Sequence, residues 1–215
     1  MKLHTVVVTY NRLELTKQTI GSYLETVTVP FTLVVVDNRS DEDLRQWLLN
    51  QFDYGIYLLN ENHYPGFACN RGWERAPKDA IFLHRSDNDF RFLPGWCEET
   101  QRMFEANSKL GQLGLRTDEE ELFVAQNTGG NCVIRRELWD QGLRWDETPW
   151  PKYPPGWSED SFFSPAVLNM GYEWDRVERP CIESLASGDW RDPYYQESYG
   201  ARRIKPHPND PTVPR

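Results

Sequence analysis

Residues 3–12 read LHTVVVTYNR, and this stretch decides the fold. Residues 3–9 are short and rich in β-branched side chains, which is typical of a buried parallel strand. Polar side chains follow at the carboxyl end of that strand, in Thr9, Tyr10 and Arg12. In an open parallel sheet, ligands bind outside the carboxyl ends of the strands. The stretch therefore predicts a layered α/β sheet whose first strand delivers polar groups to a binding site.

Two more apolar runs end in the same way. Residues 31–36 lead into Asp37, and residues 80–84 lead towards Asp87 and Asp89. Because the carboxyl ends of parallel strands meet at one edge, we expect these aspartates to lie near the end of the first strand. A tyrosine and an aspartate can hold a base there, and acidic side chains can hold a cation that binds a diphosphate. The sequence thus predicts a site for a nucleotide-linked substrate.

Helical and strand patterns alternate along the rest of the chain. We expect helices near residues 13–24, 41–48, 66–75, 95–106, 135–141 and 158–169. Further strands are expected at residues 55–59, 113–115, 131–134 and 172–177. This alternation predicts a Rossmann-like, mostly parallel central sheet flanked by helices. We expect one domain over residues 1–204 and an extended or disordered tail over residues 205–215, which contain four prolines.

Composition excludes several classes of protein. The net charge of -9 argues against broad binding of a nucleic-acid backbone, which needs a positive field. The mean hydropathy is -0.72 and no run approaches about twenty apolar residues, so we expect no membrane span. The four cysteines form no Cys-x-x-Cys pair, which argues against a structural zinc site. We expect buried, reduced thiols in a soluble, cytoplasmic protein without a leader segment.

Six motifs follow one another along the chain: VVVTYNR at 6–12, VVVDNRSD at 34–41, NHYPGFACNRG at 62–72, DND at 87–89, TGGNCVIRR at 128–136 and GWSED at 156–160. In this order they resemble the inverting, metal-dependent glycosyltransferases of family 2, and in particular their rhamnosyltransferase-like members. Each motif alone is common, but the ordered set spans roughly residues 3 to 180. The resemblance implies a GT-A fold with a small acceptor-side sheet, and transfer of a sugar from a nucleotide-diphosphate donor.

The resemblance assigns the nucleotide to the first two strand ends. Tyr10 would stack on the base and Asp37 would accept a hydrogen bond from its N–H group. The alternative is that Asp37 caps the following turn, as aspartate often does. Thr9 and Arg12 would lie at the rim of this site, with Arg12 near a phosphate.

Asp87 and Asp89 occupy the position of the family's Asp-x-Asp metal motif. Two carboxylates on a tight turn offer oxygen ligands to Mn²⁺ or Mg²⁺, which would stabilise the diphosphate leaving group. We expect Asp89 to be the direct ligand, with help from Asp87. Many relatives supply a histidine after the last strand as a further ligand, whereas residues 181–187 read CIESLAS.

Asp160 occupies the position of the general base at the start of a helix. Inverting transfer needs one carboxylate to take a proton from the acceptor hydroxyl. The alternative is a carboxylate that only stabilises the helix dipole. Glu159, Trp157 and Gly130 would shape the acceptor site, with Glu159 hydrogen-bonding the acceptor.

Two further residues have equally good structural and functional interpretations. Gly66 and Asn70 would let the backbone approach the diphosphate, or they would belong to the turn that starts a helix.

The sequence thus predicts a metal-assisted, inverting glycosyltransferase that favours a UDP-sugar. Its acceptor would be a glycan, a lipid-linked intermediate, a protein or a modified nucleobase. One alternative is a sugar-nucleotide pyrophosphorylase, but residues 10–13 lack the Gly-rich basic loop of that chemistry. The other alternative is a non-catalytic module that binds nucleotide-sugars or carbohydrates. The presence of Asp89 and Asp160 argues against this alternative.

Overall fold

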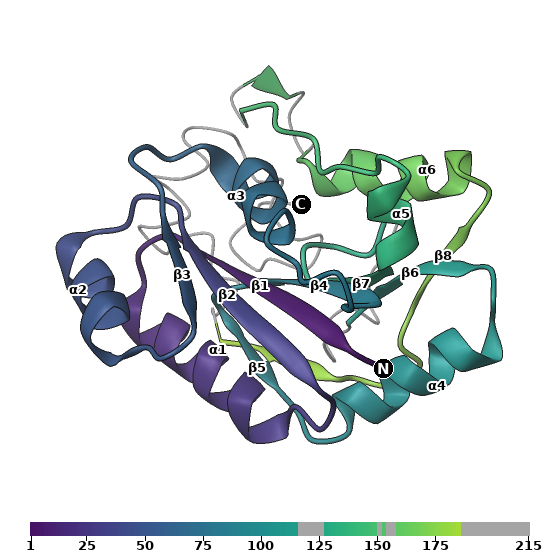
Figure 1. The fold of residues 1–215 in the computed structure, drawn as a ribbon, viewed down its shortest axis with the longest axis horizontal. Helices are drawn as coiled ribbons and strands as arrows, with labels where there is room; N and C mark the ends of the chain where they lie inside the picture. The colour runs from purple at the N-terminus through teal and green to yellow at the C-terminus, as the bar shows by residue number, and fades with distance from the viewer. Residues whose placement is uncertain (116–126, 150–151, 154–157, 186–215) are drawn as a thin grey trace, which may run out of the picture.

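The computed structural model describes residues 1–115, 127–149, 152–153 and 158–185. Its centre is a seven-stranded sheet with strand order β3-β2-β1-β4-β7-β6-β8 (Figure 1). The four strands from β3 to β4 run parallel, and β7 pairs antiparallel with both β4 and β6. The strands are β1 (Leu3–Thr9), β2 (Phe31–Asp37), β3 (Gly55–Leu58), β4 (Phe82–Asp87), β6 (Leu110–Gly114), β7 (Cys132–Arg135) and β8 (Glu173–Arg176).

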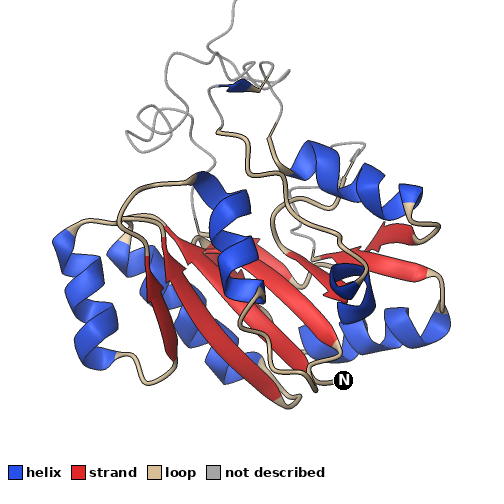
Figure 2. Cartoon of the chain, turned by 45° about the horizontal axis from the view of Figure 1, so that its top comes forward, coloured by secondary structure: helices blue, strands red, loops and turns tan. Residues whose placement is uncertain are grey.

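Helices cover both faces of this sheet (Figures 1 and 2). One face packs on α1 (Leu13–Thr26), α2 (Glu42–Gln51) and α4 (Trp96–Ala106). The other face packs on α3 (Tyr64–Trp73), α5 (Arg136–Asp140) and α6 (Asp160–Asn169). Each side forms its own cluster of buried apolar side chains because successive residues of a strand point to opposite faces.

The predicted fold class is confirmed, with differences in the smaller elements. The strands expected near residues 113–115 and 131–134 join the central sheet as β6 and β7. The separate small sheet consists of β5 (Phe90–Phe92) and β9 (Ile182–Ser184), which sequence patterns did not reveal because they are only three residues long. The tail over residues 205–215 lies outside the described residues.

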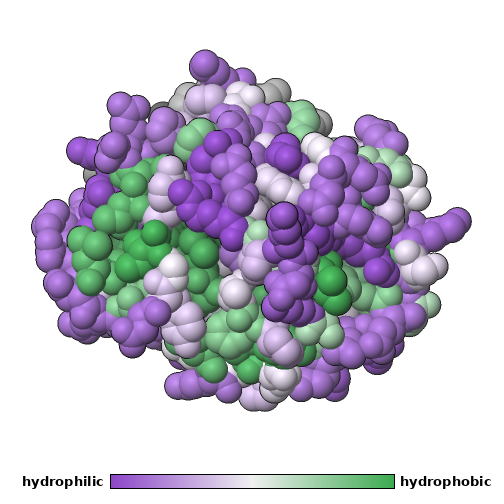
Figure 3. All heavy atoms as spheres, viewed as in Figure 1, coloured by the Kyte–Doolittle hydropathy of each residue, from purple (hydrophilic) through white to green (hydrophobic). Residues whose placement is uncertain are grey.

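The face of the molecule seen in Figure 3 is mainly hydrophilic. In the view of Figure 3, polar residues cover the rim, and an apolar area lies in the left part of the molecule, where β2, β3 and α2 are found. All four cysteines are buried, as expected. Among the described residues, no helix combines the length and the apolar character that a membrane crossing requires.

Candidate active site

The parallel register brings the predicted strand ends together. Thr9 at the end of β1 pairs with Asp37 at the end of β2, and Val8 pairs with Asp87 at the end of β4. Tyr10 follows directly after β1 and is partly exposed. The sheet therefore gathers the polar groups that the sequence predicted for one edge.

The turn after β1 holds two residues in a left-handed backbone conformation. Asn11 and Arg12 have φ angles of 55° and 62°. The Asn11 backbone N–H donates to Ser40 Oγ at 2.8 Å, and the Asn11 side-chain oxygen accepts from the Asp41 N–H at 2.7 Å. A left-handed backbone conformation is strained for residues other than glycine. Such strain persists where surrounding contacts hold the backbone in place, and it is frequent at functional sites.

This turn carries Arg12 to the predicted metal ligand. Arg12 Nη1 donates to Asp89 Oδ2 at 2.8 Å, and both side chains are mostly buried. Burial raises the pKa of Asp89 to about 6, the nearby Asp87 carboxylate adds to the rise, and Arg12 opposes it. Asp89 therefore combines a mostly buried carboxyl, a second carboxylate nearby and one cation in direct contact.

Asp37 is fully buried and caps the turn that follows β2. Both of its carboxylate oxygens accept from the Ser40 N–H, at 3.2 and 3.3 Å. Thr9 Oγ1 donates to it at 3.5 Å, and Arg45 Nε lies 3.7 Å away. Burial raises the pKa of Asp37 despite these partners. The capping interpretation thus has direct contacts, and contact with a base stays a prediction.

Arg85 is the residue that sequence reasoning missed. It lies in β4, only 1% of its side chain is exposed, and its Nη2 donates to Glu159 Oε1 at 2.7 Å and to Asp87 Oδ1 at 3.2 Å. Its Nη1 donates to Asp160 Oδ1 at 3.4 Å. The signal was a charged residue inside a buried strand, two positions before Asp87 and hence on the same face.

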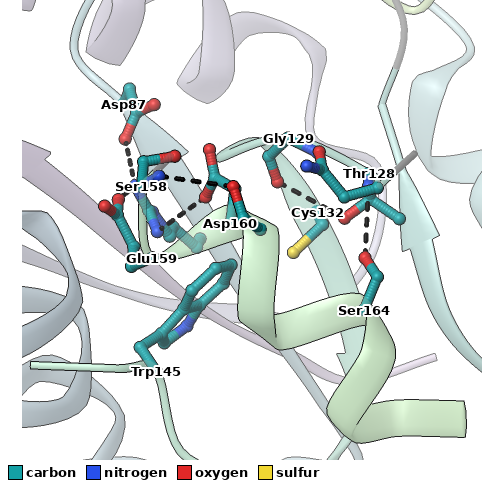
Figure 4. Close-up of polar contacts among 12 residues, drawn as sticks. Asp87, Thr128, Gly129, Cys132, Trp145, Ser158, Glu159, Asp160 and Ser164 are labelled. Atoms are coloured by element: carbon teal, nitrogen blue, oxygen red, sulfur yellow. Dashed lines mark hydrogen bonds and ion pairs between the residues drawn. The ribbon is translucent and has the colours of Figure 1, made fainter. Parts of the chain in front are cut away.

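The three carboxylates come from two distant parts of the chain and point towards one another (Figure 4). Asp87 ends β4, whereas Glu159 and Asp160 stand at the start of α6. The Glu159 side chain is only 3% exposed, while those of Asp160 and Asp87 are 23% and 35% exposed. Glu159 therefore faces Arg85, and the other two carboxylates remain accessible.

The ionisation of Asp160 depends strongly on its surroundings. Burial raises the pKa of its carboxyl well above the usual range, and the Glu159 and Asp87 carboxylates raise it further. The Arg85 guanidinium acts in the opposite direction. A carboxyl with a raised pKa in its basic form is a better proton acceptor than an ordinary aspartate.

The predicted glycines and Asn70 have clear neighbours. A Cβ at Gly130 would lie 2.3 Å from Asp87 Oδ2, so glycine lets β7 approach the Asp87 carboxylate. A Cβ at Gly66 would lie 2.1 Å from the Asp146 carbonyl oxygen. Asn70 Nδ2 donates to the Trp145 carbonyl at 3.0 Å, and its Oδ1 accepts from the Trp145 N–H at 3.1 Å. Gly66 and Asn70 thus anchor the segment around Trp145, and their contact with a diphosphate stays a prediction.

Two stacked aromatic rings, those of Trp145 and Phe163, support the charged cluster and form what we call the aromatic floor. The Arg85 guanidinium lies 4.3 Å from the ring centre of Trp145, which stacks on Phe163 of α6 with ring centres 3.7 Å apart. Trp145 was not singled out from the sequence. The predicted Trp157 lies outside the described residues.

The sequence and the fold of this chain resemble those of known proteins. Residues 5–143 match the sequence model described as Glycosyl transferase family 2. No curated protein gives a significant match to the sequence. One similar structure is the mannosyltransferase PcManGT from Pyrobaculum calidifontis in complex with GDP-Man and Mn²⁺, with a TM-score of 0.68 and 18% identity over 87% of this chain and 58% of that one.

Another similar structure is S. aureus TarS 1–349 in complex with UDP-GlcNAc, with a TM-score of 0.66 and 18% identity over 86% of this chain and 58% of that one. The chain thus spans less than two thirds of either protein, and at this identity the likeness concerns the fold. The family match covers more than half of the chain. The chain therefore belongs to glycosyltransferase family 2.

Proposed function

We propose that this protein transfers a sugar, with inversion, from a nucleotide-diphosphate donor to an acceptor hydroxyl. The observation that carries the proposal is the convergence of Asp160, at the start of α6, with the Asp87 turn of β4. This convergence brings the partly exposed carboxylates of Asp160 and Asp87 to the same guanidinium, which supports the proposal. Single displacement needs one base and no protein nucleophile, and Asp160 supplies that base.

Asp87 and Asp89 fit a divalent cation, Mn²⁺ or Mg²⁺. Both offer hard oxygen ligands, and burial, with the nearby Asp87 carboxylate as a second cause, raises the pKa of Asp89. When bound, the cation would neutralise the diphosphate leaving group. Among the described residues, no group of three or more His, Cys, Asp or Glu side chains is arranged so that it could hold a metal ion by itself. The diphosphate itself would thus complete the ligand set.

The nucleotide would bind at the ends of β1 and β2. Tyr10 would contact the base, Asp37 its N–H group, and Thr9 and Arg12 the rim. Gly66 and Asn70 would border the diphosphate, and Gly130, Trp157 and Glu159 the acceptor. We favour a UDP-sugar; titles of the similar structures name GDP-Man and UDP-GlcNAc as donors of those proteins.

Several wider predictions belong to the same proposal. The acceptor would be a glycan, a lipid-linked intermediate, a protein or a modified nucleobase. The enzyme would act in the cytoplasm as one domain over residues 1–204, with a rhamnosyltransferase-like subtype. These predictions rest on the resemblance of the motifs.

A panel of donors tests the proposal. The wild-type protein is incubated with UDP-glucose, UDP-GlcNAc, GDP-mannose and dTDP-rhamnose in the presence of Mn²⁺, and slow hydrolysis is followed by NMR. We expect one donor to be hydrolysed fastest, with initial release of a sugar of inverted anomeric configuration. A released sugar that keeps the configuration of the donor would contradict single displacement, and no hydrolysis of any donor would contradict the proposed function.

Metal dependence is a separate prediction. Asp89→Asn keeps the shape of the side chain but removes its charge, so Mn²⁺-dependent binding of UDP should weaken about tenfold or more, since each charge-assisted contact contributes roughly 1.5–3 kcal/mol. Calorimetry with UDP and Mn²⁺ measures the loss. Equal affinity in the variant, or full wild-type turnover in excess chelator, would rule out this metal site.

A further inference from the structure

Arg85 is an arginine inside the core of the sheet. It stands in the middle of the molecule, in β4 between β1 and β7, and it is surrounded by buried side chains. A buried charge is costly unless it is paired and hydrogen-bonded. The residue must therefore be understood through the groups that its guanidinium contacts.

Glu159 is the partner that balances this charge. The Arg85 Nη2 to Glu159 Oε1 distance of 2.7 Å is the shortest in the cluster, and Glu159 is itself almost fully buried. If charge balance were the only role of Arg85, this one ion pair would be sufficient.

The guanidinium nevertheless reaches further, to the two accessible carboxylates. Nη2 is shared with Asp87 and Nη1 is directed at Asp160, so the planar fork spans the end of β4 and the start of α6. Trp145 lies against the guanidinium, and Phe163 stacks on Trp145, so the plane of the fork is fixed from α6 as well. A planar guanidinium that stacks on an aromatic ring fixes the directions of its hydrogen bonds. A compact charge, such as an ammonium group, cannot do this.

We propose that Arg85 is a positioning residue that holds the Asp160 carboxylate in register with the Asp87 turn. This inference rests on the proposed function, because it concerns the geometry between base and donor. Misplacement of a catalytic group by about 1 Å can cost on the order of 100-fold in rate. Arg85 would thus act on turnover, and much less on the binding of the nucleotide.

The decisive variant removes the buried ion pair as a unit. In Arg85→Met/Glu159→Gln, one positive and one negative charge leave together, so the nearly buried Glu159 position carries no unpaired charge. Asp87 and Asp160 lose the guanidinium but remain partly exposed, so the protein should fold. We expect hydrolysis of the best donor to fall about 10- to 100-fold in kcat, with the KM for the donor and the calorimetric Kd for UDP within about twofold of wild type.

Arg85→Lys is the second variant. It keeps the positive charge but replaces the fork by a compact ammonium group. We expect its kcat to fall by about tenfold or more as well, because one ammonium cannot direct both Asp87 and Asp160.

Arg135 provides a matched control in the neighbouring strand. Its guanidinium donates to the backbone carbonyls of Leu110 and Phe104, and Arg135 pairs with Phe82, three residues before Arg85 in β4. Arg135→Met should lower the unfolding midpoint and leave kcat of the remaining folded enzyme unchanged.

The outcomes distinguish failure of the positioning role of Arg85 from failure of the proposed function. Turnover of the double variant or of Arg85→Lys within about twofold of wild type would overturn the positioning role of Arg85. A fall confined to the KM for the donor would overturn it too, because Arg85 would then serve donor binding. Absence of hydrolysis in the wild-type protein would instead contradict the proposed function itself.

Discussion

Asp160 combines two properties that rarely occur together on a protein surface. Its carboxylate is partly exposed, yet its pKa is raised by burial and by the neighbouring Glu159 and Asp87 carboxylates. The guanidinium of Arg85 limits that rise. The residue is therefore set up to accept a proton in the neutral range rather than near the usual value of about 3.9.

Asp160→Asn tests this at the residue scale. The amide keeps the shape but cannot take a proton, so kcat for donor hydrolysis should fall by about 10²–10⁴-fold. Calorimetry should show a nearly unchanged Kd for UDP. Near-normal turnover in the variant would exclude Asp160 as the base.

The pH profile provides a second prediction for the same residue. Only the ionised carboxylate accepts a proton, so the rate should rise with pH through the raised pKa of Asp160 and level off above it. Glu159→Gln removes a neighbouring negative charge, which lowers the pKa of Asp160 and should move the rising limb to lower pH. Rate profiles of both proteins measure the shift; a flat wild-type profile across the neutral range would contradict the assignment.

Asp37 tests the nucleotide site. Asp37→Ala removes an acceptor that could bind a base N–H, and such a contact is worth roughly 1.5–3 kcal/mol. Calorimetry with UDP should show that loss, together with lower stability because the Ser40 N–H loses its partner. Lower stability with an unchanged Kd would assign Asp37 to the turn alone.

At the scale of elements, glycines set how closely helix α3 packs on the sheet. A Cβ at Gly72 would lie 2.5 and 2.6 Å from the methyl groups of Val6 in β1, and 3.1 Å from Val36 in β2. Asn70, on the same helix, fixes the segment around Trp145. The distance between α3 and the sheet therefore influences the floor under Arg85.

Gly72→Ala should destabilise the protein by about 1–3 kcal/mol, because the extra methyl overpacks the interface between α3 and β1. Gly21→Ala in α1 is the matched control, since nothing lies within 4 Å of its Cβ position. That substitution should stabilise the protein by about 0.5–1 kcal/mol through helix propensity. Urea unfolding of both variants checks the pair; equal effects would show that packing at Gly72 does not limit stability.

At the scale of the whole molecule, strand β4 carries buried polar residues to both faces of the sheet. Arg85 faces the carboxylate cluster, and the preceding residue, His84, points to the opposite side among the rings of Tyr23, Phe92 and Trp96. Burial lowers the pKa of His84 to about 3. The folded protein therefore keeps His84 neutral at pH values where the unfolded chain would protonate it.

This arrangement predicts sensitivity of the whole fold to acid. Between about pH 6.5 and about pH 3 the unfolded histidine binds a proton that the folded one does not, so unfolding becomes easier by up to about 1.4 kcal/mol per pH unit as the pH falls. His84→Phe should lose less stability between about pH 7 and about pH 5 than wild type. His4, whose pKa burial also lowers, keeps part of the effect in the variant. Urea unfolding at both pH values measures the difference; equal losses would contradict this role.

Local pattern was sufficient for most of the fold. The β-branched runs of β1 and β2 and the helical spacing of α1 and α2 depend on neighbouring residues, so the sequence alone predicted a mostly parallel sheet with polar strand ends. It also predicted which aspartates would lie at that edge, because chain direction in a parallel sheet fixes the edge. The three-residue strands β5 and β9 were missed because each exists only through pairing with the other.

The network of charges was decided by tertiary structure. Arg85 and Glu159 are 74 positions apart, and no periodicity relates them, yet β4 and α6 bring them to 2.7 Å. The pairing of Arg12 with Asp89 and the capping of the Ser40 N–H by Asp37 likewise depend on how turns after different strands meet. The sequence by itself determined the sheet, the edge at which its polar strand ends meet and the acidic residues on that edge. Only the folded structure decided which charges neutralise each other, because Coulomb interactions and burial depend on distances in space rather than along the chain.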